Sequence, residues 1–428
     1  MSGIRVVFFL RYVSFFFLIG FSLSLYGEKA GSVSALSLEQ AKGFGLDTVG
    51  GLGGRVLKVT NLASKGAGSL AWALQQSGPR VVVFEVGGVI DLKGEKLKIS
   101  QPYLTLAGQT APSPGITIIR GGLLVRAHDI RIEHIRVRPG DNFESPLSGW
   151  DTDGIAVSRG NAKRVHIDHV SVSWAVDENL SATGQRTKGW GYSASDVTFS
   201  NCIVAEALDY ASHEKGRHSK GLLVHDYVKN VAVLGNLFIS NDRRNPYFKS
   251  HATGVVVNNL MYNVGNHAVY VDYIVDEWER SSLQPGNPKI SVVGNVLRYG
   301  RDTYSDLALV YGSGDVYLRD NKVFNLQQKP MPHRGSAVKL LEAPTVWPEG
   351  LKAMDVNRVE KSVLANAGAR PWDRDEVDQR IIDSYKSRSS RIIDSQSDVG
   401  GYPKYPEVRR PLTVPDENIS AWLQSFKR

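Results

Sequence analysis

Cysteine is almost absent from this chain of 428 residues. Cys202 is the only one, so no intrachain disulfide can form, and packing and hydrogen bonds have to hold the fold together. The apolar residues around Cys202 predict that it is a buried filler and not a reactive thiol. The sequence therefore excludes a disulfide-stapled scaffold.

Long apolar runs are also scarce. The clearest one, residues 12–25, follows Arg5 and Arg11 and is shorter than the roughly 20 residues that a membrane-spanning helix needs. This pattern predicts a secretory signal peptide over residues 1–27. The mature protein would then be periplasmic or extracellular, with no attachment to a membrane. An uncleaved anchor is the alternative, because no well-formed small-x-small cleavage site is evident.

Acidic residues are outnumbered by basic ones. The chain has 51 Lys and Arg against 43 Asp and Glu, a net charge of +8 and a sequence pI of 9.3. Residues 1–27 contain two arginines and no acid, so the charge without them is still +6. Such a charge favours an acidic partner, either an anionic polysaccharide, a nucleic acid or a lipid surface. A composition of 42% hydrophobic and 22% charged residues argues against disorder.

Helical periodicity is nearly missing between residues 81 and 325, where β-branched residues and Gly, Asn and Asp turns are frequent. One short pattern recurs there: an apolar residue, another two positions later, and an inward-facing position three further on. Its copies are Ile130/Ile132/Ile135, Val165/Ile167/Val170, Val197/Phe199/Cys202, Val231/Val233/Asn236, Gly254/Val256/Asn259, Ile290/Val292/Asn295 and Val316/Leu318/Asn321. A fixed motif at irregular spacing predicts the coils of a strand-rich solenoid whose loops differ in length.

The fold class that follows is all-β, a parallel β-helix of stacked strands. Four copies of the pattern place asparagine at the same offset, and these side chains would hydrogen-bond along the stack at the strand spacing of about 4.8 Å. A propeller is the alternative, but it would need regular blades of roughly 40 residues with four strands each.

Both ends of the solenoid carry predicted closures. Residues 69–76 predict a short capping helix at the first coil. Near the other end, one helix would begin at Asp355 and stop at Gly368, and a second would begin with a capping-box-like pair, Asp373 and Glu376. We therefore expect a β-helix domain over residues 28–335 and a mainly helical or irregular closing segment over residues 336–428, whose tail beyond Gly400 runs along the surface.

Residues 241–249 contain three cations, Arg243, Arg244 and Lys249, just after residues 231–238, which predict a half-buried strand. Cations at the point where a strand gives way to a loop are well placed to bind an anion. The alternative is a surface pair of arginines that fixes the loop.

Acidic residues form a second group. Asp151 and Asp153 lie on one side of an extended segment, and Asp177 with Glu178 follows about one coil later. Oxygen donors of this kind suit calcium, although they are equally compatible with solvated aspartates in turns.

A series of motifs, in order along the chain from about Gly43 to Pro403, resembles the secreted bacterial pectate lyases of polysaccharide lyase family one. They are Asp47-Thr48-Val49-Gly50-Gly51, Lys58-Val59-Thr60-Asn61-Leu62, Gly68-Ser69-Leu70, Leu104-Thr105-Leu106-Ala107-Gly108-Gln109-Thr110-Ala111-Pro112, Ile167-Asp168-His169-Val170-Ser171-Val172-Ser173-Trp174 and Arg243-Arg244-Asn245-Pro246. The resemblance implies a right-handed parallel β-helix, a calcium cofactor and cleavage of polygalacturonate by β-elimination.

The resemblance also implies roles for single residues. Arg244, in Arg244-Asn245-Pro246, matches the proposed base of the family. An arginine is an awkward base because its pKa lies above about 12. The charges of Arg243, Lys220 and a bound metal would lower that pKa, which predicts an alkaline optimum. Lys220 matches the lysine that engages the substrate carboxylate, and Lys249 stands where the family usually has another arginine.

Asp151, Asp153 and Asp177 match the metal-binding acids of the family, whereas Ser181 stands where many relatives have a further aspartate. Arg243, Tyr247 and His218 are the predicted substrate-binding residues. Tyr247 replaces an arginine that is common after the proline, which affects the expected substrate more than the reaction type. We expect a monomer that binds an acidic polysaccharide and no nucleic acid.

Two other functions stay open on the sequence. A glycoside hydrolase on the same solenoid would need a pair of acids for general acid and base catalysis, and cations dominate this site. The second open function is a polysaccharide-binding protein that does not cleave its ligand. Tyr247, Lys249 and Ser181 favour it, because they replace residues that are usual in the family.

Overall fold

The computed structural model describes residues 1, 3 and 35–427. The chain divides into two units, Met1–Val33 and Ser34–Arg428, and the elements below all belong to the second. Apart from Met1 and Gly3, the predicted signal peptide lies outside the described residues. In the part of the chain that is described, no helix is long and apolar enough to cross a membrane.

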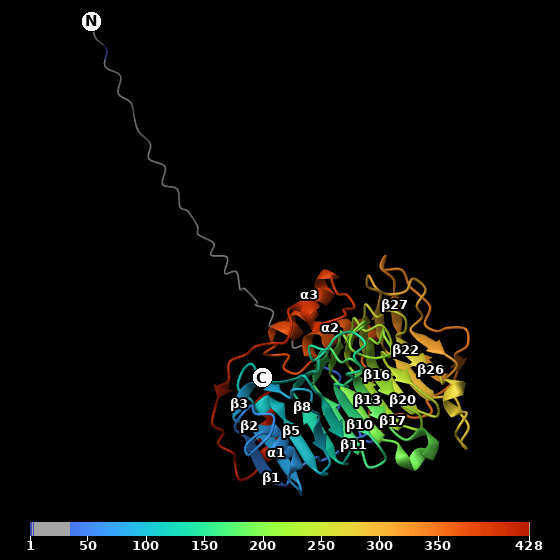
Figure 1. Ribbon diagram of the computed structural model, residues 1–428. Coiled ribbons are helices and arrows are strands. Elements are labelled where there is room, and N and C mark those ends of the chain that lie inside the picture. Colours follow the sequence, from blue (N-terminus) through green and yellow to red (C-terminus); the bar gives the residue numbers. More distant parts are fainter. Residues whose placement is uncertain (2, 4–34, 428) are drawn as a thin grey trace. The chain divides into compact units, whose positions relative to one another are not determined.

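Three sheets of stacked strands make up the body of this unit (Figure 1). Most coils of the chain add one strand to each sheet in turn, and neighbouring strands within a sheet are parallel except at β29. The eleven-stranded sheet consists of β1 (Arg55–Val59), β2 (Arg80–Phe84), β5 (Leu104–Ala107), β8 (Ile130–Glu133), β11 (Lys163–Asp168), β14 (Ser195–Ser200), β17 (Lys229–Leu234), β20 (Thr253–Val257), β23 (Lys289–Val293), β26 (Asp315–Arg319) and β28 (Lys339–Leu340).

The other two sheets complete each coil. The eight-stranded sheet consists of β4 (Leu97–Ile99), β7 (Leu123–Val125), β10 (Ile155–Ser158), β13 (Glu178–Thr183), β16 (Lys220–Val224), β19 (Tyr247–Phe248), β22 (Val269–Val271) and β25 (Val310–Gly312). The ten-stranded sheet consists of β3 (Val86–Asp91), β6 (Ile116–Ile119), β9 (Arg136–Arg138), β12 (Ser171–Ser173), β15 (Ile203–Ala205), β18 (Leu237–Ile239), β21 (Leu260–Tyr262), β24 (Val296–Arg298), β27 (Lys322–Phe324) and β29 (Val408–Arg409). The predicted all-β solenoid is confirmed.

Inward-facing residues of the recurring pattern form the core. Val165, Val197 and Val231 lie side by side in register on β11, β14 and β17, and all three are fully buried. Because side chains alternate along a strand, one apolar residue in every two is enough to fill the interior of the coil. Cys202 belongs to the same buried cluster, as predicted.

The predicted asparagine ladder is present. The amide of Asn236 donates to Asn259 at 2.9 Å, Asn259 donates to Asn295 at 2.9 Å, and Asn295 donates to Asn321 at 3.0 Å. Each asparagine thereby provides a hydrogen-bond partner for the next one at a buried turn, where water cannot replace it.

One predicted element is wrong in detail. Residues 231–238 form no single strand, because the chain turns at Gly235 and Asn236 between β17 and β18. Gly235 has a φ of 65°, a left-handed conformation that glycine adopts without strain. The turn carries the chain from the eleven-stranded to the ten-stranded sheet and places Asn236 in the ladder.

The short helix α1 (Leu70–Gln75) lies at the start of the solenoid, where a capping helix is predicted. The Ser69 hydroxyl accepts a hydrogen bond from the Trp72 amide at 3.2 Å, as an N-cap serine does. Leu70 and Leu74 are buried and belong to the main core cluster, so α1 covers apolar residues of the first coil.

Helices α2 (Val356–Asn366) and α3 (Glu376–Ser387) cover the outer face of the ten-stranded sheet (Figure 1). Asp355 caps α2, as predicted. The predicted cap of α3 is wrong: Asp375 caps this helix, while Asp373 pairs with Arg370 at 2.9 Å. Asp375 is selected because Arg138, fully buried under the helix, binds it at 2.6 Å.

The tail beyond Gly400 forms two elements that the sequence did not predict. Strand β29 pairs antiparallel with β3, and helix α4 (Ile419–Gln424) packs Leu423 against Val81 and Val83 of β2. A domain boundary at residue 335 stays a prediction.

The eight-stranded sheet is left without such a cover. Helices α2 and α3 pack on the outer face of the ten-stranded sheet, and residues 36–46 and 412–423 pack on that of the eleven-stranded sheet. None of these three outer apolar clusters of described residues includes a strand of the eight-stranded sheet. The outward-facing residues Ser181, Leu223 and Tyr247 of this sheet are nevertheless buried, whereas Lys98 and Tyr311 at its two ends are exposed.

Candidate active site

The candidate residues lie on successive connections between the ten-stranded and the eight-stranded sheet. Residues 139–154 join β9 to β10, residues 174–177 join β12 to β13, residues 206–219 join β15 to β16, and residues 240–246 join β18 to β19. Stacking of the coils brings these connections together, because each lies one strand spacing from the next. Groups far apart in sequence thus meet at one edge of the uncovered sheet.

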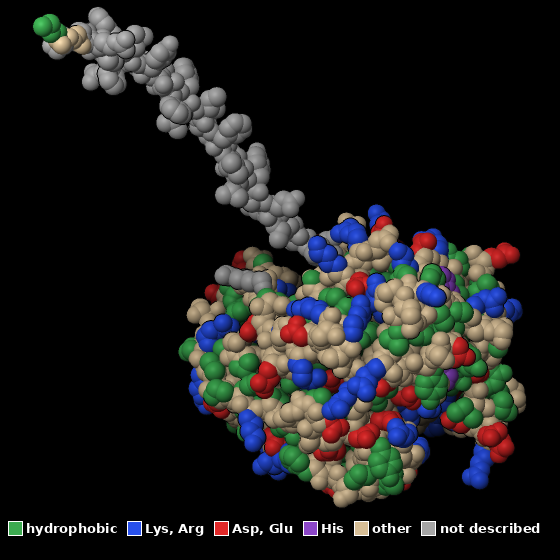
Figure 2. Space-filling model, turned by 90° about the horizontal axis from the view of Figure 1, so that it is seen from above, with side chains coloured by type: hydrophobic (Ala, Val, Ile, Leu, Met, Phe, Trp, Pro, Cys, Tyr) green, Lys and Arg blue, Asp and Glu red, His purple; other side chains and the backbone are tan. Residues whose placement is uncertain are grey.

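Overall charge does not single out this edge. On the face drawn in Figure 2, lysines and arginines are interspersed with acidic side chains and do not gather in one patch. The site is defined by particular pairs of residues and not by the net charge.

Three carboxylates converge at this edge. One oxygen from each of Asp153, Asp177 and Glu178 lies within 4.8 Å of the other two, a spacing that could hold a metal ion. Ser181 donates a hydrogen bond to Asp153 at 2.7 Å, so this serine supports an acid of the group instead of adding another. Asp151 is exposed and is not part of this group.

The pKa values of two of these acids, Asp153 and Asp177, are shifted in opposite directions. Burial, followed by the negative charge of Asp177, raises the pKa of Asp153 to about 7, against the Ser181 hydrogen bond and the charge of Lys96. Burial would also raise the pKa of Asp177, but the hydrogen bond and charge of His218, with the charges of Lys220 and Arg244, lower it to about 2. A bound cation would lower the pKa of Asp153, because it would oppose both causes of the shift, the burial of the carboxylate and the charge of Asp177.

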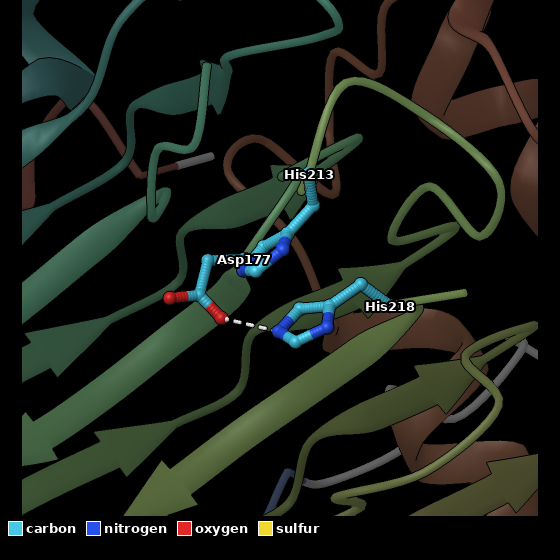
Figure 3. A group of neighbouring side chains, drawn as sticks. All are labelled: Asp177, His213 and His218. Carbon is cyan, nitrogen blue, oxygen red and sulfur yellow. Dashed lines mark hydrogen bonds and ion pairs between the residues drawn. The ribbon is translucent and has the colours of Figure 1, made fainter. Parts of the chain in front are cut away.

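His218 connects the acids to a lysine (Figure 3). Its Nε2 lies 3.0 Å from Asp177, and its ring stacks on His213 with centroids 3.6 Å apart. Lys220 contacts both ring nitrogens of His218, with Nδ1 at 2.9 Å, and burial lowers the pKa of Lys220 to about 8. The structure therefore brings Asp177, His218 and Lys220 together, as the sequence predicts.

Arg244 lies against the same acids. It forms an ion pair with Glu178, and its guanidinium carbon is 5.7 Å from the centre of the Tyr247 ring. Burial lowers the pKa of Arg244 below its ordinary value, although nearby carboxylates oppose this shift. Arg243 points elsewhere: it pairs with Asp242 at 2.9 Å, and 43% of its side chain is exposed.

Lys249 is held in a different network. It forms an ion pair with Glu277 in the short helix η4 (Val275–Trp278), and its Nζ lies 4.0 Å from the fully buried Asp226. Arg186 binds the same two acids, at 2.6 Å and 2.5 Å. Lys249 touches the site only through the Tyr247 ring, 6.0 Å from its Nζ.

Sequence reasoning missed two groups of residues here. Glu178 was visible only as a neighbour of Asp177, and its role as partner of Arg244 depends on the register that sets β13 beside β16. Asp226 and Glu277 carry no local signal, since they reach Lys249 from connections far along the chain.

Similar proteins were found by sequence and by structure, although no family model matches the chain. A probable pectate lyase C of Aspergillus flavus is 32% identical over 392 residues, which covers 89% of this chain and 84% of that protein. A probable pectate lyase C of Emericella nidulans is 37% identical over 379 residues, covering 86% and 81%. Both are fungal proteins, so the similarity extends beyond the bacterial enzymes that the motifs indicate.

Two solved structures share the fold. The cedar pollen allergen jun a 1 has a TM-score of 0.56 and 18% identity, covering 76% of this chain and 92% of that chain. A pectate lyase bound to a hexasaccharide has a TM-score of 0.53 and 13% identity, covering 79% and 99%. At such identities these structures show the fold alone.

Proposed function

The chain belongs to the pectate lyase family, and on that premise we propose that it cleaves de-esterified polygalacturonate, or a related uronan, by β-elimination. The observation that carries the proposal is the meeting of Arg244 and Lys220 with three carboxylates at one edge of the uncovered sheet. A buried lysine and a half-buried arginine beside an acidic cluster suit a substrate whose own carboxylate must be neutralised before it reacts.

The reaction needs a base, and Arg244 is the proposed one. In β-elimination the base removes the proton from C5, the electrons of that bond form a C4–C5 double bond, and the C4–oxygen bond breaks. The leaving oxygen then takes up a proton, which gives an unsaturated end and a new free end. Burial lowers the pKa of Arg244, which favours the neutral form that can accept the C5 proton.

Lys220 is proposed to bind the carboxylate next to the reacting carbon. Its ammonium is buried beside His218 and is not tied to an acid among the described residues, so it has charge to offer a uronate. Neutralising that carboxylate makes the C5 proton more acidic and stabilises the charge that develops as the proton leaves.

Calcium is the proposed cofactor. Asp153, Asp177 and Glu178 would hold it, with the exposed Asp151 nearby, because these donors are all oxygen and lie within 4.8 Å of one another. A calcium ion held by these acids would supply positive charge that helps to neutralise a uronate carboxylate. Asp177, His213 and His218 form a second possible group, whose nitrogen donors suit calcium less well.

A glycoside hydrolase is the second candidate, because one observation favours it. The pKa values of Asp153 and Asp177 are pushed apart, to about 7 and about 2, as in a pair of catalytic acids with divided roles. The two candidates differ in products, because hydrolysis gives no double bond.

Digestion of polygalacturonate tests the proposal. Ultraviolet absorbance of unsaturated ends, rising together with reducing ends, would support the lyase. Reducing ends without that absorbance would mean a hydrolase, and binding with neither product would mean a binding protein that has lost turnover. Polygalacturonate, methylated pectin and alginate as parallel substrates would identify the uronan.

The remaining features follow from this function. We propose that residues 1–27 direct export, that the protein acts as a monomer on an acidic polysaccharide, and that it binds neither nucleic acid nor membrane. The β-helix of residues 28–335 would carry the reaction, and residues 336–428 would close the ten-stranded sheet.

A further inference from the structure

A cavity lies at the β4 end of the eight-stranded sheet and includes none of the candidate residues above. Its volume is about 1090 Å³. Ser64, Lys65 and helix α1 line one side, and residues 92–98 line the other. The floor contains apolar side chains such as Leu74 and Leu97, both largely buried.

The cavity is strongly basic. Four lysines line it, Lys65, Lys93, Lys96 and Lys98, with Glu95 as the only acid among its lining residues. All four lysines are exposed, and none of them forms an ion pair with any residue that the structure describes. Unpaired cations held around a cavity are available to bind an anion.

The cavity lies in line with the candidate active site along the stack of coils. Residues 92–96 join β3 to β4 and are the first-coil counterpart of the connections that carry Asp153, Asp177 and Arg244. Backbone hydrogen bonds link these connections coil by coil: Leu97 to Gly122 at 2.9 Å, Leu123 to Gly154 at 2.9 Å, and Gly154 to Glu178 at 2.9 Å.

The sheet register gives the same continuity. Outward-facing residues form one row across the sheet, from Lys98 on β4 through Leu124, Ala156, Ser181 and Leu223 to Tyr247 on β19. Five strand spacings of about 4.8 Å separate β4 from β19, so the two ends are about 24 Å apart along the stack. An oligouronide of several residues spans that distance.

The end of the row toward β25 is formed by tyrosines and not by a lysine. Beyond Tyr247 it continues through Tyr270 to Tyr311, and the rings of Tyr247 and Tyr270 have centroids 4.6 Å apart. Asp272 lies beside Tyr270, whose hydroxyl donates to it at 3.2 Å. The row therefore has a lysine at its β4 end and tyrosines, with one acid beside them, toward β25.

We propose that the lysine cavity is a distal subsite for uronate carboxylates, occupied by the stretch of the polymer that extends from the cleaved bond toward β4. This inference rests on the proposed function. It predicts that a long de-esterified stretch on that side of the bond strengthens binding without entering the chemical step.

The test compares two pairs of lysines. Lys65→Gln with Lys98→Gln removes two charges from the cavity, and Lys163→Gln with Lys229→Gln removes two exposed charges from the eleven-stranded sheet as a control. Each variant is assayed on polygalacturonate and on trigalacturonate, which is too short to reach from Arg244 to β4. Binding of both substrates is also measured by calorimetry with metal chelated, so that the result does not depend on turnover.

We expect the cavity variant to raise KM and Kd for polygalacturonate roughly fivefold, at unchanged kcat and unchanged trigalacturonate kinetics. High salt should remove the difference, and Lys65→Arg with Lys98→Arg should restore the affinity. An unchanged Kd, an equal loss in the control variant or an equal loss for trigalacturonate would overturn the subsite. Failure of the wild-type protein to form unsaturated product from any uronan would instead overturn the proposed function, and calorimetry would still decide the subsite.

Discussion

Arg244 and Glu178 form an ion pair across two coils of the solenoid, although 66 positions separate them in the sequence. Glu178 opens β13, and Arg244 lies on the connection that leads to β19. The proposed base is thus held by an acid of the proposed metal site, which couples the two halves of the site.

Replacing Arg244 by alanine should remove turnover. A general base contributes about 10²- to 10⁴-fold to the rate, so kcat of Arg244→Ala should fall by at least about a hundredfold. Formation of unsaturated product measures the rate, and thermal unfolding checks the fold. Arg243→Ala is the matched neighbour: its exposed side chain pairs with Asp242, so this variant should affect KM more than kcat. Substantial activity of Arg244→Ala would end the assignment of Arg244 as base.

Much of the fold and part of the candidate site were predictable, because the sequence motifs that indicate them are short and local, and some repeat along the chain. The asparagine ladder follows from a fixed offset between apolar pairs and Asn236, Asn259, Asn295 and Asn321, and a parallel stack is what such a repeat can form. The resemblance named Arg244 and Lys220 through single motifs, and the structure places both beside the acids.

What could not be predicted depends on contacts between distant segments. Asp373 and Asp375 are equally able to cap a helix, and only the buried Arg138 decides for Asp375. The same holds for Lys249, whose partner Glu277 comes from a connection 28 positions away. The pairing of β29 with β3 likewise joins residues more than 300 positions apart, and no local pattern announces it.

Chelation should suppress the activity, and calcium should restore it. The acids Asp153 and Asp177 repel each other without a cation, so we expect Asp177→Asn to raise the calcium concentration needed for half-maximal activity by roughly a hundredfold. Asp151→Asn, which changes an exposed acid outside the group, should raise it much less. Calcium binding by calorimetry gives a second readout. Activity that is indifferent to chelation would remove the metal from the mechanism.

Lys249 should matter for stability as well as for activity. Lys249→Met leaves Glu277 and Asp226 each without one cationic partner, which should lower the free energy of unfolding by about 1–3 kcal/mol. Glu277→Gln is the comparison, because it frees Lys249 while keeping its charge. Denaturant midpoints and kcat are measured for both. Unchanged stability of Lys249→Met together with a large loss of kcat would mean that Lys249 acts on the substrate directly.

Stability should depend on pH through Asp129. Burial would raise the pKa of Asp129, but hydrogen bonds from Arg164 and His128, with the charge of Arg164, lower it to about 2. An unfolded aspartate has a pKa of about 3.9, so the ionised form stabilises the native state above about pH 4. That contribution, about 2 kcal/mol, is lost as the pH falls from about 4 to about 2.

Asp129→Asn should therefore be less stable than the wild-type protein at pH 7, and the two should converge below about pH 2. Urea midpoints across this range measure the difference. Asp320→Asn is the control, because its ion pair with Arg319 is exposed on both sides and contributes little. A constant gap between Asp129→Asn and wild type from pH 7 to pH 2 would show that ionisation of Asp129 is not the cause.

The asparagine ladder should be most sensitive at its middle. The amide of Asn259 accepts hydrogen bonds from the backbone and side chain of Asn236 and donates to Asn295 and Val233, and all of these groups are buried. Asn259→Ala would leave at least two of them unsatisfied, which should cost about 3 kcal/mol. Asn321 ends the ladder, where it accepts from the backbone and side chain of Asn295 and donates to Val292, so Asn321→Ala removes fewer hydrogen bonds and should cost about 2 kcal/mol. Denaturation midpoints of both variants, and of Asn236→Ala with Asn259→Ala, provide the measurement. Equal losses of unfolding free energy at the middle and at the end would mean that each asparagine acts alone. If the double variant loses less than the sum of the two single variants, the stability lies in the hydrogen bonds between the asparagines.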